Sequence, residues 1–522
     1  MSEYLEHLVG IDHHNRDDLW RYGTHPALWG TVALACIALR VFYVFYLHPL
    51  ANIPGPRLAK ITDAWKVYQT YKGTYTTTMR INHAKWGNAV RIGPNEVSLC
   101  EPDEIKTLYG HGTKWPKGPF YIPWAISERS HFSHLDPALH ANGRRAVAAA
   151  YSTNHLLGLE SFADYNTSKL FGYFDRAVAN QSVCDVAHLI EWFAYDTVSE
   201  ISFGKPFGFL DSGEDTRNIL PAFAKGTAFV VFFACSNSWG WVSTTRAVRW
   251  FVNNVLANNS SAIFVRYSTE LVGERVALKE NDPESFEEKH DMLSHFFNAV
   301  DPATKQKLGF SRLVRECSTL VIAGADTTKS TMLGFLRHIY DPKNAESLAR
   351  LRAEISTALE EGQLDFPVSY DQGSKLEYLQ AAIKEATRMH PAVGMALQRV
   401  TPAGGAQIGP HFYPEGTLVG MSGWLVHYDP RAYGDDCEEW KPERWLDADG
   451  KSDLHKYNLA FGAGARVCLG KNISIMEMLK LLPSIVWHYD FTFENPDQPF
   501  QVNESWFAVP HDFPCRLQKR EV

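Results

Sequence analysis

One cysteine in the C-terminal part of the chain lies in a setting suited to metal binding. Cys468 stands in a glycine-rich loop, with Arg466 two residues before it and Gly470 two residues after it. Apolar residues then recur at helical spacing over residues 473–486, which predicts a buried helix directly after the loop. The free N–H groups and the positive dipole end of that helix favour a thiolate at Cys468.

The residues around this cysteine suit a flat prosthetic group. Gly464 and Gly470 allow the backbone to come close to something flat and bulky. Arg466 carries a rigid fork of donors that matches a carboxylate. A thiolate, an open backbone and a carboxylate-binding arginine together describe the iron-ligating side of a haem pocket with one propionate nearby. The plain alternative is a buried free cysteine in a turn before a helix.

The ten residues from Phe461 to Gly470 resemble the cysteine loop of the cytochrome P450 family, F-x-x-G-x-R-x-C-x-G, at every fixed position. The resemblance implies the cytochrome P450 fold, which is mainly α-helical with small β-sheets, and a haem b cofactor (iron protoporphyrin IX). It implies that Cys468 is the axial ligand of the haem iron. The other cofactor-binding residues of the loop would be Phe461, Gly464, Arg466 and Gly470.

A second segment with chemical potential lies in the middle of the longest helical pattern, from Phe310 to Tyr340. A glycine in mid-helix costs about 1 kcal/mol relative to alanine, so Gly324 predicts a close approach by another group. Asp326 and Thr327 must be hydrogen-bonded if they are buried, and a threonine hydroxyl can bond back to the preceding turn. The plain alternative is an ordinary buried Asp–Thr pair.

This segment resembles the A-G-x-D-T sequence of the same family, which crosses the oxygen-binding face of the haem. The resemblance implies that Thr327 positions dioxygen by hydrogen bonding and that Asp326 relays protons from solvent. Ala323 would lie beside the substrate. Cleavage of dioxygen needs two protons and electron donation from the thiolate. The pair therefore favours a monooxygenase over relatives that rearrange preformed peroxides.

A helix is predicted to begin at Asp136, because Pro137 directly follows this capping acid. His140 and Arg144 lie four residues apart and so share one face of that helix. In the family this helix usually supplies W-x-x-x-R to a haem propionate. The resemblance therefore assigns Arg144 to a propionate, and His140 replaces the tryptophan while keeping a ring N–H donor.

Further contacts are assigned by order along the chain. By family position Arg399 would contact a propionate, whereas Val393, Leu397 and Phe507 would face the substrate. The segment from Trp115 to His134 is rich in aromatic residues, namely Trp115, Phe120, Tyr121, Trp124 and Phe132. These rings either anchor the loop or form a lid that contacts the substrate. The stretch from Trp506 to Pro510 resembles a turn that closes the pocket.

Three charged residues are predicted to brace this site. Glu385 and Arg388 stand at i and i+3 on one predicted helix, and a P-E-R segment containing Arg444 follows downstream. The family pairs such residues in an interlocked carboxylate–guanidinium triad. Because buried charges persist only when they are paired, the predicted role of the triad is structural: it supports the loop that carries Cys468.

The elements that position these residues begin with an apolar N-terminal segment. Residues 27–47 are long enough to cross a bilayer as a helix, with Arg40 able to snorkel from its C-terminal side. The plain alternative is a buried helix of a soluble protein. A proline-rich hinge follows, and Arg57 and Lys60 predict a cytosolic location for the downstream side.

The predicted organisation is a lumenal tail at 1–26, a transmembrane anchor at 27–47, a hinge at 48–58 and a catalytic domain at 59–522. Residues 60–115 are expected to form short strands and turns. Residues 219–242 are apolar but too short and interrupted for a second span. The predicted location is the endoplasmic reticulum membrane, single-pass, with the catalytic domain in the cytosol.

The composition excludes several functions. The chain has 522 residues, 45% of them hydrophobic, which is ample for a large core. A net charge of −8 without basic blocks argues against nucleic-acid binding. The eight cysteines form no C-x-x-C pair and no regular framework, which favours reduced thiols and a cytosol-facing catalytic part.

The resemblance covers essentially the whole chain, and the hinge, the D-P-x-x-H-x-x-x-R-R segment and V-T-P-A-G-G after Arg399 resemble filamentous-fungal members that tailor secondary metabolites. It implies a haem-thiolate monooxygenase that inserts one oxygen atom from O₂ into a lipophilic small molecule. Electrons would come from a separate membrane-bound NADPH–cytochrome reductase, with cytochrome b5 as a further donor, since the chain has no flavin-binding segment. The alternatives are a peroxide-rearranging haem-thiolate isomerase and a non-catalytic haem-binding protein.

Overall fold

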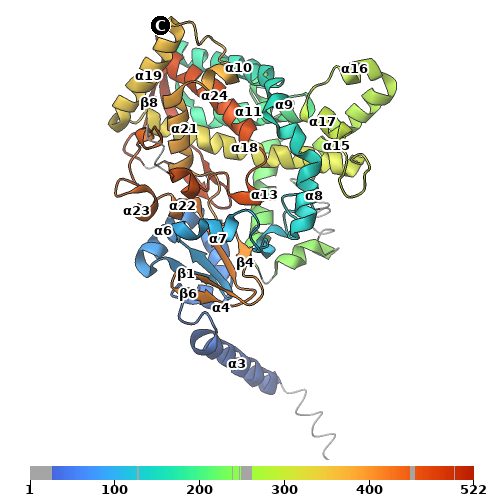
Figure 1. Ribbon diagram of the computed structural model, residues 1–522, viewed down its shortest axis with the longest axis vertical. Coiled ribbons are helices and arrows are strands. Elements are labelled where there is room, and N and C mark those ends of the chain that lie inside the picture. Colours follow the sequence, from blue (N-terminus) through green and yellow to red (C-terminus); the bar gives the residue numbers. More distant parts are fainter. Residues whose placement is uncertain are drawn as a thin grey trace, which may run out of the picture.

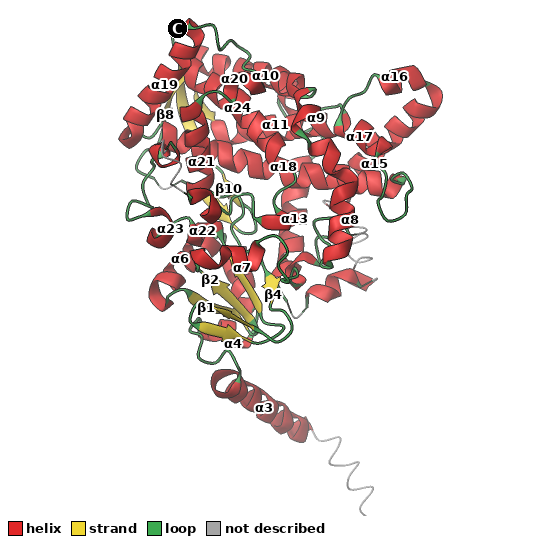
Figure 2. Cartoon of the chain, in the orientation of Figure 1, coloured by secondary structure: helices red, strands yellow, loops and turns green. Residues whose placement is uncertain are grey.

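The computed structural model describes residues 26–125, 129–237, 239–245, 247–248, 261–446, 453–498 and 500–521. Over these residues the chain is mainly helical, with small β-sheets among the helices (Figures 1 and 2). The predicted fold class is therefore confirmed. The predicted lumenal tail lies outside the described residues, apart from Pro26.

The helices and strands alternate irregularly along the chain. The α-helices are α3 Pro26–Phe42, α4 Arg57–Ile61, α5 Ala64–Tyr71, α6 Tyr75–Trp86, α7 Ile105–Tyr109, α8 Pro137–Val147, α9 Thr153–Leu157, α10 Glu160–Ala179, α11 Val186–Phe203, α12 Phe209–Ser212, α13 Ile219–Cys235, α15 Ser261–Asn281, α16 Pro283–Glu287, α17 Met292–Asn298, α18 Phe310–Ile339, α19 Ala345–Glu360, α20 Tyr370–Gly373, α21 Glu377–Met389, α22 Gly423–Val426, α23 Pro430–Tyr433 and α24 Lys471–His488. The strands are β1 Ala89–Gly93, β2 Glu96–Leu99, β3 Val183–Asp185, β4 Arg399–Val400, β5 Ala406–Ile408, β6 His411–Tyr413, β7 Leu418–Met421, β8 Tyr489–Phe493, β9 Val502–Glu504, β10 Ala508–Pro510 and β11 Pro514–Lys519.

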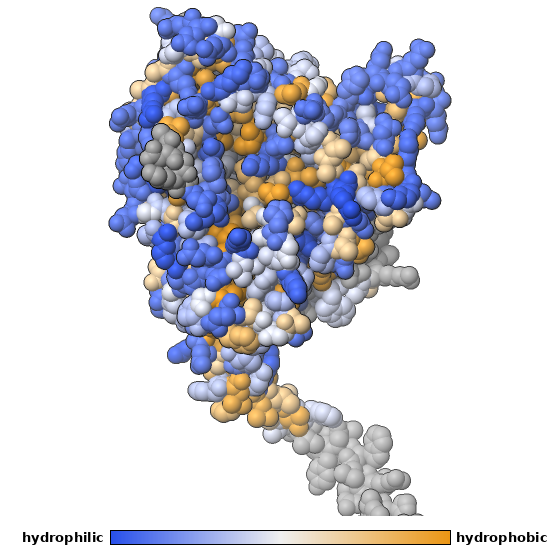
Figure 3. All heavy atoms as spheres, viewed as in Figure 1, coloured by the Kyte–Doolittle hydropathy of each residue, from blue (hydrophilic) through white to orange (hydrophobic). Residues whose placement is uncertain are grey.

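The N-terminal apolar segment stands away from the body of the protein. Helix α3 continues into a π-helical turn, Tyr43–Leu47, and the two extend below the folded body in Figure 1. Figure 3 shows apolar residues along its surface. Among the described residues, Trp29–Leu47 is the one helical stretch long and apolar enough to cross a membrane. It is therefore a candidate membrane anchor.

The proline-rich segment after the anchor is packed onto the body. Leu50 and Ile53 are buried in a cluster with residues of β1, β2 and β7. The fully buried guanidinium group of Arg91 on β1 donates to the carbonyl oxygens of Val44 (3.2 Å) and Leu50 (3.1 Å). The backbone N–H of Arg91 also donates to the Pro54 carbonyl oxygen (2.7 Å). These bonds fix the end of the anchor helix against the first sheet.

The region expected to hold only short strands and turns contains three helices before its strands. Helices α4, α5 and α6 occupy most of residues 57–86, so this prediction was wrong for them. The threonine-rich sequence of α6 has weak intrinsic helix propensity. Tyr75, Met79 and Asn82 are nevertheless buried at helical spacing, so tertiary packing outweighs that propensity.

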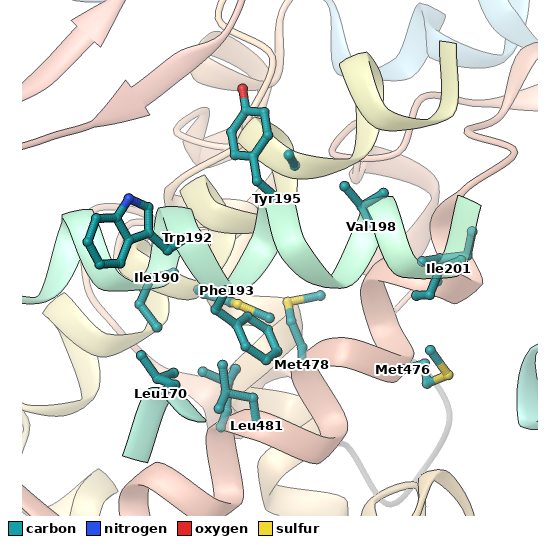
Figure 4. Packing of buried hydrophobic residues seen from close by; sticks show 14 of the residues in the cluster. Leu170, Ile190, Trp192, Phe193, Tyr195, Val198, Ile201, Met476, Met478 and Leu481 are labelled. Atoms are coloured by element: carbon teal, nitrogen blue, oxygen red, sulfur yellow. The ribbon is translucent and has the colours of Figure 1, made fainter. Parts of the chain in front are cut away.

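The largest core lies where α10, α11, α18 and α24 meet. In Figure 4 the Phe193 ring of α11 points toward Met478 and Leu481 of α24, whereas Tyr195 points away from them. The long helix α18 packs along α11. A Cβ atom on Gly324 would lie 2.9 Å from Cγ2 of Val198, so the close approach predicted at this glycine is made by α11.

β-Strands and isolated β-bridges position further residues that the sequence predicts for the site. Strands β1, β2, β7 and β4 form one sheet, in which β2 and β7 are parallel and the other neighbours antiparallel. Arg399 belongs to its edge strand β4 and forms an isolated β-bridge with Lys117. A second bridge joins Val393 to Phe507. These pairings bring segments far apart in sequence to one cavity.

Candidate active site

The cysteine loop is a tight turn closed by its own backbone. The Cys468 N–H donates to the Phe461 carbonyl at 2.7 Å. Gly462 and Gly464 have φ values of +69° and +61°, which side chains rarely tolerate. Helix α24 begins at Lys471, three positions after the cysteine, as the apolar periodicity predicts.

The two glycines predicted to approach a flat ligand differ in their surroundings. A Cβ on Gly464 would lie 1.9 Å from the carbonyl oxygen of Tyr109, so the close approach at Gly464 is to the chain's own helix α7. A Cβ on Gly470 would meet nothing within 4 Å, and this residue lines a cavity. The open backbone inferred from the sequence is thus located at Gly470.

Cys468 is the cysteine available to a ligand. All eight cysteines lie in described residues; only Cys36 on the anchor and Cys468 are exposed, and Cys468 lines the cavity. Packing around the thiol raises the pKa of Cys468, while the N–H groups of Gly470 and Lys471 and the charge of Arg144 lower it. The helix-end effect predicted from the sequence is therefore present, but desolvation outweighs it in the metal-free chain. Binding a metal ion would shift the balance to the thiolate.

The cavity has a volume of about 280 Å³ and lies between the cysteine loop and α18. Most of the residues predicted for the site line it, namely Cys468, Phe461, Arg466, Gly470, His140, Arg144, Arg399, Thr327, Ala323, Val393, Leu397 and Phe507. Asp326 and Gly464 do not belong to its lining. One cavity therefore gathers residues that span more than half of the chain.

Positive charge is concentrated on one part of this cavity. Arg144 donates to the Val467 carbonyl at 2.7 Å, and Arg466 to the His134 and Leu135 carbonyls at 3.3 Å each. Arg399 donates to the Gln398 carbonyl at 3.0 Å. Within the described part of the chain, none of these guanidinium groups forms a salt bridge with a carboxylate; Arg399 also lies 4.8 Å from the Tyr109 ring centroid.

Arg144, Arg399 and Arg466, which we call the cation cluster, have electrostatics that suit an anionic ligand. Burial and then the neighbouring Arg399 lower the pKa of Arg466 to about 10. Burial, followed by the charges of Arg466 and Lys117, lowers the pKa of His140 to about 3, so this ring is neutral at pH 7. Mutually repelling buried cations are costly unless an anion compensates them. Two carboxylates of one ligand would supply that compensation.

These features fit a haem. Over the described residues no group of three or more His, Cys, Asp or Glu side chains could hold a bare metal ion. A single exposed thiol beside a cavity instead suits a metal already held by a macrocycle, with its propionates at the cation cluster. Cys468 would hold the iron, and Arg144, Arg399 and Arg466 would hold the propionates.

The opposite wall is formed by α18. The Thr327 hydroxyl donates to the Ala323 carbonyl at 2.6 Å, which is the back-bond predicted from the sequence, and α18 remains helical over its full length. Because the hydroxyl proton is engaged, the Thr327 oxygen presents its lone pairs to the cavity as an acceptor.

Comparison with known proteins decides the family. The family model for Cytochrome P450 matches residues 54–512. The chain belongs to the cytochrome P450 family. A cytochrome P450 monooxygenase of Emericella nidulans, cicH, is 31% identical over 93% of this chain and 97% of the relative. Pisatin demethylase of Fusarium vanettenii is 30% identical over 92% of each chain. A cytochrome P450 monooxygenase of Aspergillus terreus is 33% identical over 84% of this chain and 90% of the relative.

Asp326 of this P450 lies beside α11 and not in the cavity. The Tyr195 hydroxyl donates to its carboxylate at 3.3 Å, and Lys329 forms an ion pair with Glu191 (2.6 Å) close by. Burial raises the pKa of Asp326 to about 6, although Lys329 opposes the shift. The carboxyl group can therefore take up and release a proton near neutral pH.

The charged triad is assembled as the resemblance implies. Arg388 makes two parallel hydrogen bonds of 2.8 Å with the carboxylate of Glu385, and both side chains are fully buried. Arg444 donates to the same carboxylate at 3.0 Å. The Arg388 guanidinium also bonds the His427 and Cys437 carbonyls. The triad thereby ties α21 to the segment that precedes the cysteine loop, and none of its members lines the cavity.

Sequence reasoning missed two charged residues of the cavity. Lys117 lies beside Arg399 and Arg466, and burial followed by these charges lowers its pKa well below the usual range. Glu477 of α24 is buried, and no described residue bonds its carboxyl group; burial raises its pKa to about 8. Glu477 could have been predicted, because it is an acidic residue within the apolar run after Cys468. The sequence around Lys117 has no comparable feature.

Proposed function

We propose that this P450 is a haem-thiolate monooxygenase that inserts one oxygen atom from O₂ into a lipophilic small molecule, as a tailoring step in secondary-metabolite biosynthesis. The proposal is carried by one observation: the exposed thiol of Cys468, the cation cluster and the Thr327 hydroxyl all line the same cavity. The fungal relatives named as monooxygenases support the same reaction class.

The cofactor would be haem b. When bound, it supplies the oxygen-activating and electron-accepting chemistry that no side chain can perform. The residues of this chain bind and surround it: Cys468 ligates the iron, and Arg144, His140, Arg399 and Arg466 hold the propionates. Phe461 and Gly470 complete the cofactor contact on the cysteine side.

Two side chains of α18, Asp326 and Thr327, would take part in proton transfer and hydrogen bonding at the site. Thr327 accepts a hydrogen bond at the oxygen-binding face, and Asp326 receives protons on the side of α18 that faces α11. The net reaction, RH + O₂ + 2e⁻ + 2H⁺ → ROH + H₂O, consumes two protons, which gives Asp326 a catalytic task. Ala323, Val393, Leu397 and Phe507 would contact the substrate. A peroxide-rearranging isomerase needs no proton supply, so the Asp326–Thr327 pair favours the monooxygenase.

The chain would work on a membrane with a separate electron donor. We propose residues 27–47 as a single-pass anchor in the endoplasmic reticulum, 48–58 as the connecting segment and 59–522 as a cytosolic catalytic domain. Electrons would come from an NADPH–cytochrome reductase, with cytochrome b5 as a second donor. The basic residues that follow the anchor, Arg57 and Lys60, support this orientation.

The first test is the difference spectrum of the reduced full-length chain with carbon monoxide, in membranes that carry it. We expect a Soret band strongly red-shifted from that of imidazole-ligated haem. The Cys468→Ala variant should lose this band, while Cys36→Ala, which removes the other exposed cysteine, should keep it. A haem signal without the shift would contradict thiolate ligation. Product formation without reductase or NADPH would favour the isomerase instead.

A further inference from the structure

Two cysteines stand opposite each other in the sheet formed by β3, β11 and β8. Strand β3 pairs antiparallel with β11, and Cys184 is the register partner of Cys515. About 330 positions separate the two residues in the sequence, so only the fold brings them together. Within the described residues no other cysteine lies on a β-strand.

The backbone geometry of this pair suits a disulfide. Directly opposed residues of an antiparallel pair have Cα atoms about 4.5–5.5 Å apart, and their side chains project from the same face of the sheet. A disulfide requires Cα atoms about 4.4–6.8 Å apart and Cβ atoms about 3.5–4.5 Å apart. Opposed Cβ atoms lie about 4.5–5.5 Å apart, so they must approach by about 1 Å. Strand β3 is a short edge strand, which allows that approach without disturbing a long ladder.

Both thiols are reduced and buried in the resting structure. They are free, and Cys184 is 7% exposed and Cys515 0% exposed. Burial, and then the charge of Asp185, raises the pKa of Cys184 to about 11. Burial, and then the charge of Cys184, raises the pKa of Cys515; Asp185 and Glu494 add to this shift and Arg337 opposes it. Since the thiolate is the reactive form of a cysteine, the pair reacts slowly at neutral pH.

Cys184 is the more accessible member of the pair. Val183 and Asp185, on either side of it in β3, are exposed. Elements with few buried contacts open locally at low cost, and β3 is such an element. Hydrogen peroxide is little larger than water and can therefore reach Cys184 first, because Cys515 lies on the central strand of the sheet.

A bond at this position would join two segments that both adjoin α18. Strand β3 leads directly into α11, which packs along α18. Strand β11 follows β10, whose Ala508 carbonyl accepts a 2.5 Å hydrogen bond from Ser330 of α18. A disulfide between Cys184 and Cys515 would thus tie the C-terminal strand to the start of α11.

We propose that Cys184 and Cys515 are a modification site at which a hydroperoxide forms a disulfide. The Cys184 thiolate attacks one peroxide oxygen and the O–O bond breaks. Hydroxide leaves and takes up the proton that the thiol released, which gives water and a sulfenic acid. The Cys515 sulfur then attacks the sulfenic sulfur, the S–S bond forms, and the hydroxyl group leaves as water with the Cys515 proton.

The net reaction is 2 R–SH + H₂O₂ → R–S–S–R + 2 H₂O. The two thiols are oxidised by two electrons, and the peroxide is reduced to two water molecules. The reaction uses neither haem nor a reductase, so this inference does not depend on the proposed function.

The test begins with the full-length haem-loaded chain in detergent, incubated with hydrogen peroxide at about pH 8.5, where more thiolate is present. Free thiols are then blocked with N-ethylmaleimide and the chain is digested without reduction. We expect mass spectrometry to find a peptide pair joined through Cys184 and Cys515, which dithiothreitol separates. Recovery of both cysteines as blocked thiols, or as separate sulfinic acids, would overturn the proposal.

The stability of the same oxidised sample measures what the bond holds. Dithiothreitol should lower its apparent melting temperature by about 3 °C or more, because a disulfide that closes so long a loop restricts the unfolded chain. Cys184→Ala and Cys515→Ala should each lose both the linked peptides and this shift. Cys437→Ala, which removes a buried cysteine outside the strands, should keep both.

An equal dithiothreitol-sensitive shift in Cys184→Ala would assign the effect to another pair of cysteines and contradict the proposal. The peptide analysis of the unsubstituted chain decides whether the bond forms even where a variant does not fold. The carbon monoxide spectrum tests Cys468 separately, so failure of this inference is distinguishable from failure of the proposed function.

Discussion

The Tyr195 hydroxyl donates a 3.3 Å hydrogen bond to Asp326 on the face of α18 that packs against α11. The next residue, Thr327, faces the cavity. Two adjacent residues, about 100° apart around the helix axis, thus face different surroundings: Asp326 faces α11 and Thr327 faces the cavity. The ion pair between Lys329 and Glu191 lies near Asp326, and the Glu191 side chain is 21% exposed. Under the proposed function, the side of α18 at Asp326 would receive protons and the side at Thr327 would bind oxygen.

Replacing Asp326 with Asn should slow product formation about a hundredfold, because the amide cannot pass on protons. Tyr195→Phe keeps the carboxyl group and should cost less than tenfold. Both effects would be measured as product formed per NADPH consumed with reductase present, at one fixed pH. Unchanged turnover in Asp326→Asn would show that protons arrive by another route.

Thr327→Ala should divert consumed electrons from product to hydrogen peroxide, because the acceptor oxygen at the cavity wall is lost. Thr327→Ser keeps the hydroxyl and should retain most of the coupling. The measurement is the ratio of hydrogen peroxide to product at equal NADPH consumption. If Ala and Ser behave alike, the hydroxyl group has no part in oxygen handling.

Arg144 and its neighbour Arg145 offer a matched pair on α8. Arg144 lines the cavity, whereas Arg145 is exposed. Arg144→Gln should accelerate the transfer of haem to a haem-free acceptor protein about tenfold, because a charge-assisted bond to a propionate is lost. Arg145→Gln should leave this rate unchanged. Equal rates in both variants would argue against a propionate at Arg144.

Glu477 should make the haem-free chain less stable as pH rises. Its carboxyl group loses its proton near pH 4.5 when unfolded but only at about pH 8 when folded, so between these values the folded state binds more protons. The stability contribution is thus fully present below pH 4.5 and is lost toward pH 8, by up to about 4 kcal/mol. Glu477→Gln should therefore raise the melting temperature more at pH 8 than at pH 5. A pH-independent difference between the two proteins would contradict the buried neutral carboxyl group.

Loss of the triad should cost far more stability than loss of a surface ion pair. Glu385→Gln leaves the buried guanidinium group of Arg388 without its anionic partner and should cost about 3–5 kcal/mol of unfolding free energy. Asp371→Asn breaks the exposed pair between Asp371 and Lys375 and should cost less than about 1 kcal/mol. Urea unfolding followed by tryptophan fluorescence would compare them. Similar costs would show that the triad does not brace the fold.

Local patterns in the sequence were sufficient for several elements. Helix α18 coincides with the longest helical pattern. Helix α8 begins at Pro137, directly after its N-cap Asp136, whose carboxylate accepts from the Ala138 and Leu139 N–H groups. These signals are local, because capping and helical periodicity act between residues a few positions apart. Helix α6 was not predictable in the same way, because its burial depends on contacts with the rest of the body.

The cysteine loop, the Asp–Thr pair on α18 and the three charges of the triad could be named from residue types and spacing together with the resemblance to cytochrome P450s. Only the tertiary structure showed that Gly464 packs closely against the backbone of helix α7. It also showed that Asp326 faces Tyr195 and not the cavity, whereas Lys117 and Glu477 line the cavity. The sequence determined which residues can bind and react, since that is the chemistry of each side chain in its local motif. Folding decided which of them share one cavity, because contacts between distant segments, such as Trp124 with Trp506, set the direction and burial of each side chain.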